Sequence, residues 1–418
     1  MLLIPLIFFL LLAVYFYMKH RCLNLDVSAT LILIAISFFS ILIDINDVYG
    51  DYGINEYAVT LPTILLYCIQ WTLVLLPLHY LSCIKLQRHQ PHKLLFLSIF
   101  IIILIASSAL MIATSLTDIR DALIMDMVDV YKQNDSLRAL GGHGESNYLM
   151  LLPHIFVSAP FPTLALFFWF YLKAFTKTPL VIRIGLLLAS IVQAVLSIIV
   201  AGRAALIYWI FDFFLLFGFF YQYLSRRLKR GITIASFVIG GLIIGQMLLI
   251  TISRFGEDSG RGSKVDPLVS LYAYAGQHVN NFCAVIADGG DAPVQIGRVL
   301  PLTNKIVNHQ DFDLIQHYEN IHASVNIIVN VFDTFGGELY LDLGWFGYIV
   351  FFLFLILFTQ IIRYNWRELT FHRVFPVVIF IAFFTRGLFA WPFVGHYTTF
   401  ALMLVIIACL SFKYTFKV

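Results

Sequence analysis

Glu319 and His322 have the types and spacing of a carboxylate that orients an imidazole. Residues i and i+3 of a helix face the same side, so this pair can act as a general base for a hydroxyl group. A hydrated loop histidine is the plainer interpretation of His322, and His278 is a competing base. Glu-x-x-His also occurs in di-metal bundles, but the second copy that these need is missing from the sequence. We therefore expect no metal at this pair.

Four arginines are candidates for binding an anion. Arg203 lies at a predicted turn between helices, Arg386 lies among phenylalanines, and Arg254 and Arg261 open a flexible charged segment. A cation in apolar surroundings is costly, and arginine can hold phosphate through two parallel hydrogen bonds while it stays charged. The alternative is an arginine that extends to the membrane interface or pairs with a buried acid such as Asp342.

These residues sit in a chain dominated by apolar side chains. Of its 418 residues, 60% are hydrophobic and 12% are charged. Apolar runs recur along the whole length, and each can cross ~30 Å of hydrocarbon as a helix. We predict about eleven such spans in an all-α polytopic integral membrane protein: Met1–Met18, Val27–Ile43, Ala58–Ile84, Leu94–Leu116, Tyr148–Leu172, Leu180–Val200, Ala204–Leu224, Ile232–Ile252, Leu339–Ile362, Val374–Ala390 and Phe393–Phe412.

The basic residues predict an orientation, because they concentrate in alternate short loops and cytoplasmic loops carry the excess of Lys and Arg. With the N-terminus outside, the C-terminus is inside and two longer segments are extracytoplasmic. The sequence thus divides into an N-terminal membrane bundle (1–252, with a minor outer loop at 117–147), a large outer loop (253–337) and the C-terminal membrane helices (338–418). A net charge of +3 gives no reason to expect nucleic acid as a partner.

The large outer loop is expected to hold two helices of its own. The first begins at Asp266-Pro267, which provide an N-cap and a first-turn proline, and ends near Asp288. Its polar face would carry Tyr274, His278 and Asn281, opposite an apolar face. The second runs from Asp311 to about Phe332. We expect this helix pair to lie over the membrane bundle with its polar side toward a cavity.

Three local patterns resemble those of the oligosaccharide repeat-unit polymerases, the Wzy-type O-antigen polymerases. Ala201-Gly202-Arg203-Ala204-Ala205 is similar to the family's small-Gly-Ser/Gly-Arg-small pattern. Leu271-Tyr272-Ala273-Tyr274-Ala275-Gly276 resembles its tyrosine-rich loop stretch. Asn330-Val331-Phe332-Asp333-Thr334 with Tyr340-Leu341-Asp342-Leu343-Gly344-Trp345-Phe346-Gly347 resembles its Asn-Val-Tyr-Thr…Tyr-x-Asp-Phe-Gly-x-x-Gly signature, although Phe332 and Asp333 interrupt the first half and Leu343 replaces a Phe. The resemblance covers the C-terminal half of the chain.

The resemblance implies a fold related to the GT-C glycosyltransferases and an activity at the outer face of a bacterial inner membrane, with the active loops in the periplasm. The substrate would be an oligosaccharide linked to undecaprenyl pyrophosphate, and the growing chain would move from its lipid carrier onto a fresh lipid-linked unit. The reaction requires neither a nucleotide nor a metal, so no cofactor is expected. The lipid bilayer is a partner, and a chain-length regulator is a further candidate.

The residues and the resemblance together give a set of expected site residues. The catalytic candidates are His322, Glu319, Arg203 and His278. The candidates for substrate binding are Arg254, Arg261, Arg386, Tyr272, Tyr274, Asn281, Tyr340 and Asp342. The tyrosines can stack on sugar rings, although aromatic residues at a membrane interface are usually belt residues.

Three other functions stay open. An O-antigen ligase, which transfers the glycan to lipid A core, takes the same donor and has the same architecture. A flippase for lipid-linked oligosaccharides would be expected to show internal repeats and short loops, which do not fit the long outer loop. A membrane acyltransferase is the weakest alternative.

Overall fold

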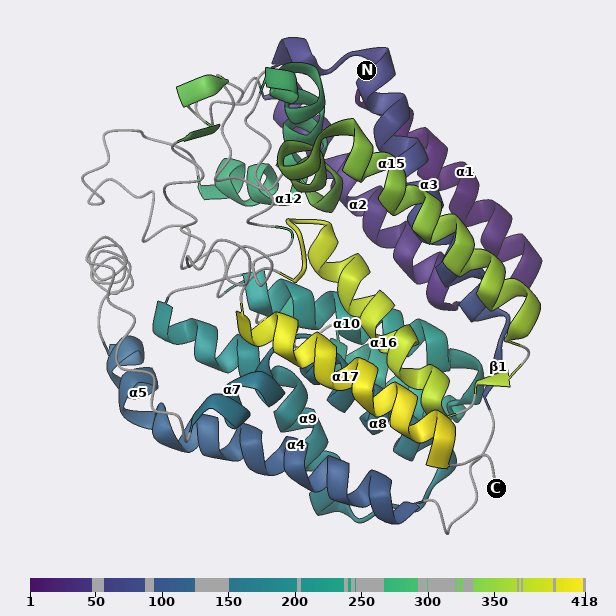
Figure 1. Ribbon diagram of the computed structural model, residues 1–418, viewed down its shortest axis with the longest axis vertical. Helices are drawn as coiled ribbons and strands as arrows, with labels where there is room; N and C mark the ends of the chain where they lie inside the picture. Colours follow the sequence, from purple (N-terminus) through teal and green to yellow (C-terminus); the bar gives the residue numbers. More distant parts are fainter. Residues whose placement is uncertain are drawn as a thin grey trace. The chain divides into compact units, whose positions relative to one another are not determined.

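The computed structural model of the protein describes residues 1–46, 56–86, 94–124, 150–200, 204–236, 240–241, 245, 267–291, 299, 320–321, 323–325, 334–366, 368–369, 371–393 and 396–415. These residues are almost entirely helical, with one pair of two-residue strands. Figure 1 shows the helices and strands coloured along the chain. The predicted all-α class is confirmed for this part of the chain.

Five helices in the described residues are long and apolar enough to cross a membrane, and they identify a multi-pass membrane protein. They are Leu3–His20, Leu25–Ile45, Leu61–Ser82, Ala204–Tyr223 and Thr334–Asn365. Shorter apolar helices cover Ser98–Thr114, Phe161–Phe175, Leu180–Leu196 and Tyr397–Ile407. Each of these helices falls on a predicted span.

The chain folds into two compact units that do not follow the linear division by loops. Unit 1 combines Met1–Gln87 with Tyr272–Thr399, and unit 2 combines Arg88–Leu271 with Phe400–Val418. The described helix of the large loop packs in unit 1, where Asn280 bonds to Ser40 and the Phe282 ring packs on that of Tyr67. Each unit is described by itself below.

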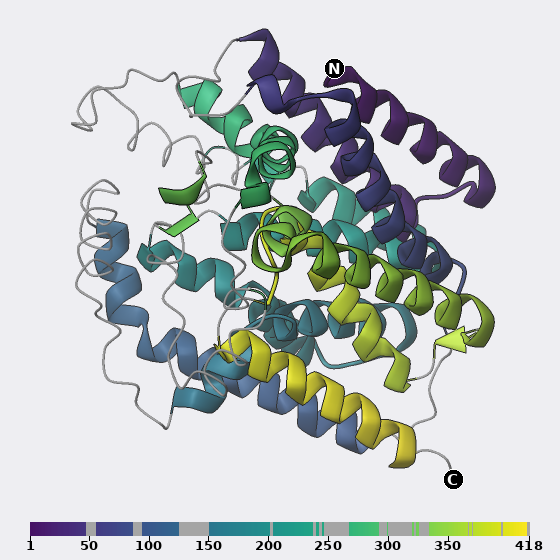
Figure 2. The same cartoon turned by 45° about the horizontal axis from the view of Figure 1, so that its top comes forward.

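Unit 1 contains the first three helices of the chain, the loop helix and two late helices. They are α1 (Leu3–His20), α2 (Leu25–Ile45), α3 (Leu61–Ser82), α12 (Pro267–Asp288), α15 (Thr334–Asn365) and α16 (Phe371–Gly387). In both views α1, α2, α3 and α15 lie side by side (Figures 1 and 2). The neighbours in sequence alternate in direction, as short connections require.

A short parallel ladder joins two connections of unit 1. Strand β1 (Lys85–Leu86) follows α3, and strand β2 (Glu368–Leu369) follows α15, with Lys85 opposite Glu368. The carboxyl ends of α3 and α15 therefore meet at one end of the unit, which we call the β1–β2 end. The basic residues of these two connections predict that both lie on the same side of the membrane. The ladder, which joins the two connections, agrees with that prediction.

The other end of unit 1, which we call the α12 end, depends on close helix approaches. A Cβ atom at Gly276 of α12 would overlap the backbone of Phe39 and Ser40 in α2, so only glycine allows this crossing. At Gly336 a Cβ atom would overlap the side chain of Gln70 in α3. The start of α15 and the middle of α12 are thus fixed against the first helices of the chain.

Helix α15 is two helices in sequence rather than one straight span. Gly344 has φ 63° and ψ −164°, a conformation essentially restricted to glycine, and it divides a buried first part from a longer second part. Side chains of the second part such as Phe346 and Leu357 are exposed, as expected of a lipid-facing helix. The predicted outer loop ended at Gly337, but the structure is already helical from Thr334.

Unit 2 is a second helical bundle. Its elements are α4 (Leu94–Thr114), α5 (Leu116–Ile124), α7 (Leu151–Val157), α8 (Phe161–Phe175), α9 (Leu180–Leu196), α10 (Ala204–Phe220) and α17 (His396–Thr415, from Phe400 onward). The predicted single span Tyr148–Leu172 is wrong in detail. Pro160, which has no N–H to donate, separates α7 from α8. The predicted span Ile232–Ile252 lies largely outside the described residues.

Candidate functional site

Five buried polar side chains lie on the helices of unit 1 that meet at its α12 end. They are Gln70 of α3, His278 of α12, Thr334 and Glu338 of α15, and Arg386 of α16. We call this set the α12-end cluster. Polar groups inside a membrane protein are expensive unless they are paired, so such a set is a functional candidate by default.

The side chain of Gln70 connects α3 to both parts of α15. Its amide Nε2 donates to Thr334 Oγ1 at 3.3 Å, and the Tyr348 hydroxyl donates to its Oε1 at 3.0 Å. Thr334 has φ 68°, an uncommon conformation for a β-branched residue, and it is fully buried. The first turn of α15 is therefore held in a strained geometry by its surroundings, which is common where a site must be preorganised.

The turn that follows α16 links Arg386 to the other elements of the cluster. The carbonyl of Arg386 accepts from the backbone N–H of Phe389 at 2.9 Å, and the Glu338 carboxylate accepts from the backbone N–H of Trp391 at 2.5 Å. Arg386 lies in the last turn of α16 and Glu338 in the second turn of α15. Arg386 thus sits at the end of α16 whose dipole favours a positive charge.

Arg386 is the predicted anion-binding residue that the structure describes best. Only 6% of its surface is exposed, so its guanidinium lies inside the protein rather than at its surface. Helix α16 packs on α3 through Phe384 and Trp71, whose ring centroids are 5.5 Å apart. A buried guanidinium can pair with a phosphate group that leaves water.

His278 is fully enclosed in α12, and its ring packs edge-on against Phe389 at a centroid distance of 4.6 Å. This helix is not among the five that are long and apolar enough to cross the membrane. Burial lowers the pKa of His278 to about 3, which keeps the imidazole neutral near pH 7. A general base works best with a pKa near the working pH, so His278 is better suited to hydrogen bonding than to proton abstraction.

The predicted two faces of α12 are not seen in the structure. Its bounds agree with the prediction, but Gln277, His278 and Asn281 are as buried as the apolar Val279 and Phe282. The helix is surrounded by protein rather than laid over a bundle with one wet face. The neighbouring Asn280 accepts a hydrogen bond from Ser40 Oγ at 3.1 Å, which fixes α12 to α2.

The remaining described candidates lie around this cluster. Tyr272 and Tyr274 are half-buried in α12, and the Tyr274 ring lies 6.4 Å from that of Phe389. Tyr340 is buried, and its ring packs edge-on against Trp345 at 4.9 Å. Their sugar-stacking roles stay predictions.

Asp342 has a defined structural contact. Its Oδ2 accepts from the backbone N–H of Val299 at 2.7 Å, so it fixes a point of the large loop to α15. Its predicted role in substrate binding stays a prediction.

Five of the predicted site residues lie outside the described residues. They are Arg203, Arg254, Arg261, Glu319 and His322. The structure brings together the described candidates on α12, α15 and α16, and it adds Gln70, Thr334 and Glu338, which sequence reasoning missed. Gln70 is a polar residue in the middle of an apolar run, and this signal could have identified it.

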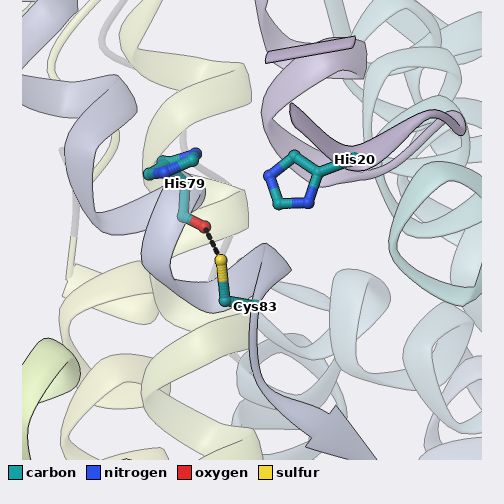
Figure 3. Close-up of side chains that lie close together, drawn as sticks. All are labelled: His20, His79 and Cys83. Carbon is teal, nitrogen blue, oxygen red and sulfur yellow. Dashed lines mark hydrogen bonds between the residues drawn. The ribbon is translucent and has the colours of Figure 1, made fainter. Parts of the chain in front are cut away.

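A second polar group, also missed, lies at the β1–β2 end of unit 1. It consists of Lys19 and His20 at the end of α1, Asp26 in the first turn of α2, and His79 and Cys83 at the end of α3. We call it the α1–α3 cluster. Figure 3 shows His20 facing His79, with Cys83 one turn further along. The signals in the sequence were the four-residue spacing of His79 and Cys83 and an acid, Asp26, beside an apolar run.

Unit 2 contains an apolar groove with a volume of about 400 Å³. Trp169 of α8 and Trp209 of α10 line it, and Lys173 is the charged residue among its lining residues. Nearby, Asp212 of α10 accepts a hydrogen bond from Thr163 Oγ1 at 2.6 Å, which joins α10 to α8. The groove offers an apolar chain a surface to lie on.

Comparison of the chain with models of known protein families, with curated proteins and with solved structures gives no match. The functional conclusion therefore depends on the residues and contacts given above.

Proposed function

We propose that the protein is a membrane glycosyltransferase that polymerises polyprenyl-pyrophosphate-linked oligosaccharide repeat units. The observation that carries the proposal is the α12-end cluster, in which buried Arg386 lies among helices that also bury Glu338 and His278. Elements far apart in the sequence converge to hold these groups inside a multi-pass membrane protein. The resemblance of the C-terminal patterns to O-antigen polymerases supports the same reaction.

In the proposed reaction Arg386 stabilises the departing pyrophosphate. Its burial excludes water, and two parallel N–H donors match two phosphate oxygens in a way that a lysine does not. Arg203, Arg254 and Arg261 are the further cations proposed for the same leaving group. Glu338 fixes the turn after α16 through Trp391 and so acts as a positioning residue.

The acceptor sugar needs a base for its hydroxyl. We assign this role to His322 oriented by Glu319, because burial has lowered the pKa of the competing His278 far below the pH of catalysis. His278 is then a neutral hydrogen-bonding residue next to the leaving group.

The proposed setting is the bacterial inner membrane, with about eleven spans in a GT-C-like arrangement and the α12 end on the periplasmic side. Single cysteines at positions 135, 310 and 229, in a background without other cysteines, test this orientation. We expect a membrane-impermeant thiol reagent to label positions 135 and 310 from the periplasm and position 229 only after the cytoplasmic face is opened. Labelling of position 310 from the cytoplasm alone would contradict the site assignment.

The activity itself is tested with purified protein in detergent and a lipid-linked repeat unit as the sole substrate. We expect a ladder of polymers without added nucleotide. Transfer to lipid A core without polymer would make the protein a ligase, and transbilayer movement of the substrate without new glycosidic bonds would make it a flippase. A requirement for nucleotide would contradict the proposal.

The arginine is tested by Arg386→Ala, which we expect to lower the polymerisation rate on the order of 10²–10³-fold, as loss of one electrostatic contact in a dry site typically does. Arg386→Lys should restore part of the rate, because it keeps the charge but not the planar pair of donors. The matched control is Arg363→Ala, which removes an exposed arginine near the β1–β2 end. A wild-type rate in folded Arg386→Ala protein would remove this residue from the site.

The same assay separates the two bases. His322→Ala should slow polymerisation by about 10²-fold or more, and Glu319→Gln should have a smaller effect because it only orients the imidazole. Arg203→Ala should abolish polymer without affecting membrane insertion. An inactive His278→Ala protein beside a normal His322→Ala protein would move the base to α12.

A further inference from the structure

The α1–α3 cluster contains three side chains that could bind a metal, two histidines and a cysteine, at the β1–β2 end of unit 1. One nitrogen of His20, one nitrogen of His79 and the Cys83 sulfur all lie within 4.8 Å of one another. His79 and Cys83 are one helical turn apart on α3, and His20 is provided by α1 (Figure 3). The ring centroids of His20 and His79 are 5.4 Å apart.

The hydrogen bonds of His79 determine which of its nitrogens can bind a cation. Its Nδ1 lies 2.6 Å from Asp26 Oδ2, an acceptor, so Nδ1 carries the proton and donates it. Its Nε2 lies 2.8 Å from the ammonium of Lys19, a donor, so Nε2 presents its lone pair. The lone pair of Nε2 therefore already faces the ammonium group of Lys19.

Asp26 is the carboxylate that usually accepts the N–H of a metal-binding histidine. It is fully buried, its Oδ1 accepts from the backbone N–H of Val27 at 2.8 Å, and its Oδ2 also lies 3.3 Å from His20 Nε2. A carboxylate behind a histidine fixes the ring and its tautomer and makes the free nitrogen a better ligand. Phe16 stacks on the other side of the His79 ring, at a centroid distance of 4.9 Å, and holds its plane.

We propose that His20, His79 and Cys83 form a binding site for a divalent transition-metal ion of the Zn²⁺ class. Two imidazoles and one thiolate suit such an ion, and they leave a fourth position for water or another ligand. The ammonium of Lys19 occupies the cation position beside His79 Nε2 in the free protein. When the ion binds, Lys19 withdraws on its exposed side chain, and the Cys83 thiol loses its proton.

The Cys83 thiol is placed for this change. In the free protein its sulfur donates to the carbonyl oxygen of His79 at 3.5 Å, a weak contact within the last turn of α3 (Figure 3). Cys83 is exposed and follows the last residue of the helix, so its side chain can turn toward the two imidazoles without moving a packed core. The bound ion would join the end of α1 to the end of α3, at the opposite end of unit 1 from the α12-end cluster.

The test uses full-length, tag-free protein purified in detergent and treated with a chelator, then titrated with Co²⁺. We expect one equivalent of Co²⁺ to give a thiolate-to-cobalt charge-transfer band, and Zn²⁺ to abolish that band by replacing cobalt. Cys83→Ser should remove the band, whereas Cys409→Ser, which removes a thiol of unit 2, should keep it. Failure of the wild type to produce the band, or its survival in Cys83→Ser, would overturn the proposal.

Lys19 and Asp26 provide a second, independent readout of the same site. Lys19→Met should tighten Zn²⁺ binding by about tenfold or more, because no ammonium then competes for His79 Nε2. Asp26→Asn should weaken binding about 10–100-fold, as loss of a carboxylate bonded to a ligand histidine typically does. Equal Zn²⁺ affinities in the wild type and Lys19→Met would contradict the geometry proposed here, whatever the outcome of the polymerisation assay.

Discussion

The two ends of unit 1 bury polar side chains in different ways. At the β1–β2 end the groups are ionisable, and they come from three consecutive helices within Lys19–Cys83. At the α12 end an amide and a hydroxyl accompany three ionisable side chains, and the bonds span long stretches of sequence, such as that from Gln70 to Thr334. The first set mainly fixes helices that already lie next to one another. The second set exists only when late segments of the chain have been added.

The comparison predicts that damage at the β1–β2 end costs stability, whereas damage at the α12 end costs activity first. When one partner is removed from a set of buried ionisable groups that bond mainly to one another, the folded protein loses stability. Where polar groups from several distant segments come together, a ligand can replace their contacts with one another, so a substitution there affects activity first. The following predictions test this difference in order of expected size.

The largest effect is expected for His79→Ala. It removes the donor that lies 2.6 Å from Asp26 Oδ2 and leaves a fully buried carboxylate short of a partner. Leaving a buried charged group short of a hydrogen-bond partner costs about 3 kcal/mol of unfolding free energy. Thermal unfolding in detergent measures the loss, and polymerisation per folded molecule should be unchanged. His79→Gln keeps an amide donor and should lose less; equal losses in both variants would refute the role given to this bond.

The next effect is expected for Gly276→Ala at the α12 end. The added Cβ atom would overlap the backbone of Phe39 and Ser40, so α12 or α2 must move. Overpacking of this kind costs about 1–3 kcal/mol. The matched control is Gly231→Ala, because no atom lies within 4 Å of a Cβ built there. Destabilisation of both variants to the same extent would contradict the close approach of α12 and α2.

The buried imidazole of His278 should make the stability of the folded protein depend on pH. Burial lowers its pKa in the folded protein to about 3 from an unfolded value of 6.5, so the unfolded chain binds the extra proton between these values. Stability from this group is complete above the unfolded pKa and falls as the pH drops below it, by about 1.4 kcal/mol per pH unit. Acidification from pH 6.5 to 5 should thus cost the wild type about 2 kcal/mol more than His278→Gln. Parallel stability curves for the two proteins would show that His278 titrates normally.

The smallest effect is expected for Ser40→Ala, which removes the 3.1 Å hydrogen bond from Ser40 Oγ to Asn280. Loss of one neutral buried hydrogen bond costs about 1 kcal/mol. The control is Ser37→Ala, because the Ser37 hydroxyl only bonds to the carbonyl of Leu33 in its own helix. A larger loss in Ser37→Ala than in Ser40→Ala would mean that this contact does not hold α12.

Much of the fold can be predicted from the sequence, because a backbone in hydrocarbon must satisfy its own hydrogen bonds. Apolar runs long enough to cross a membrane must be helical, and the helices of the described residues fall where the runs predict them. The start of α12 follows from Asp266-Pro267, a local signal of capping. The break at Pro160 and the kink at Gly344 were missed, because hydropathy averages over single residues.

The candidate site was harder to predict because its members are distant in sequence and weak individually. Arg386 and His278 were identified from their residue types in unusual surroundings. Gln70 and Glu338 were missed, since a polar residue next to apolar ones gives no information on which remote helix provides its partner. The polar face of α12 was wrong for the same reason: periodicity predicts two faces, but not what covers each of them.

The helices of unit 1 are synthesised at widely separated times. Unit 1 is interrupted in the sequence by the segment between Gln87 and Tyr272, so its first three helices enter the membrane well before α15 is synthesised. At translation rates of about 5–20 residues per second, the segment from the end of α3 to the start of α15 takes on the order of 10–50 s. The bond between Asp26 and His79 can form early, whereas Gln70 can bond to Thr334 and Tyr348 only after α15 has been made. During this interval Gln70 is an exposed polar group that a chaperone or the insertion machinery has to shield.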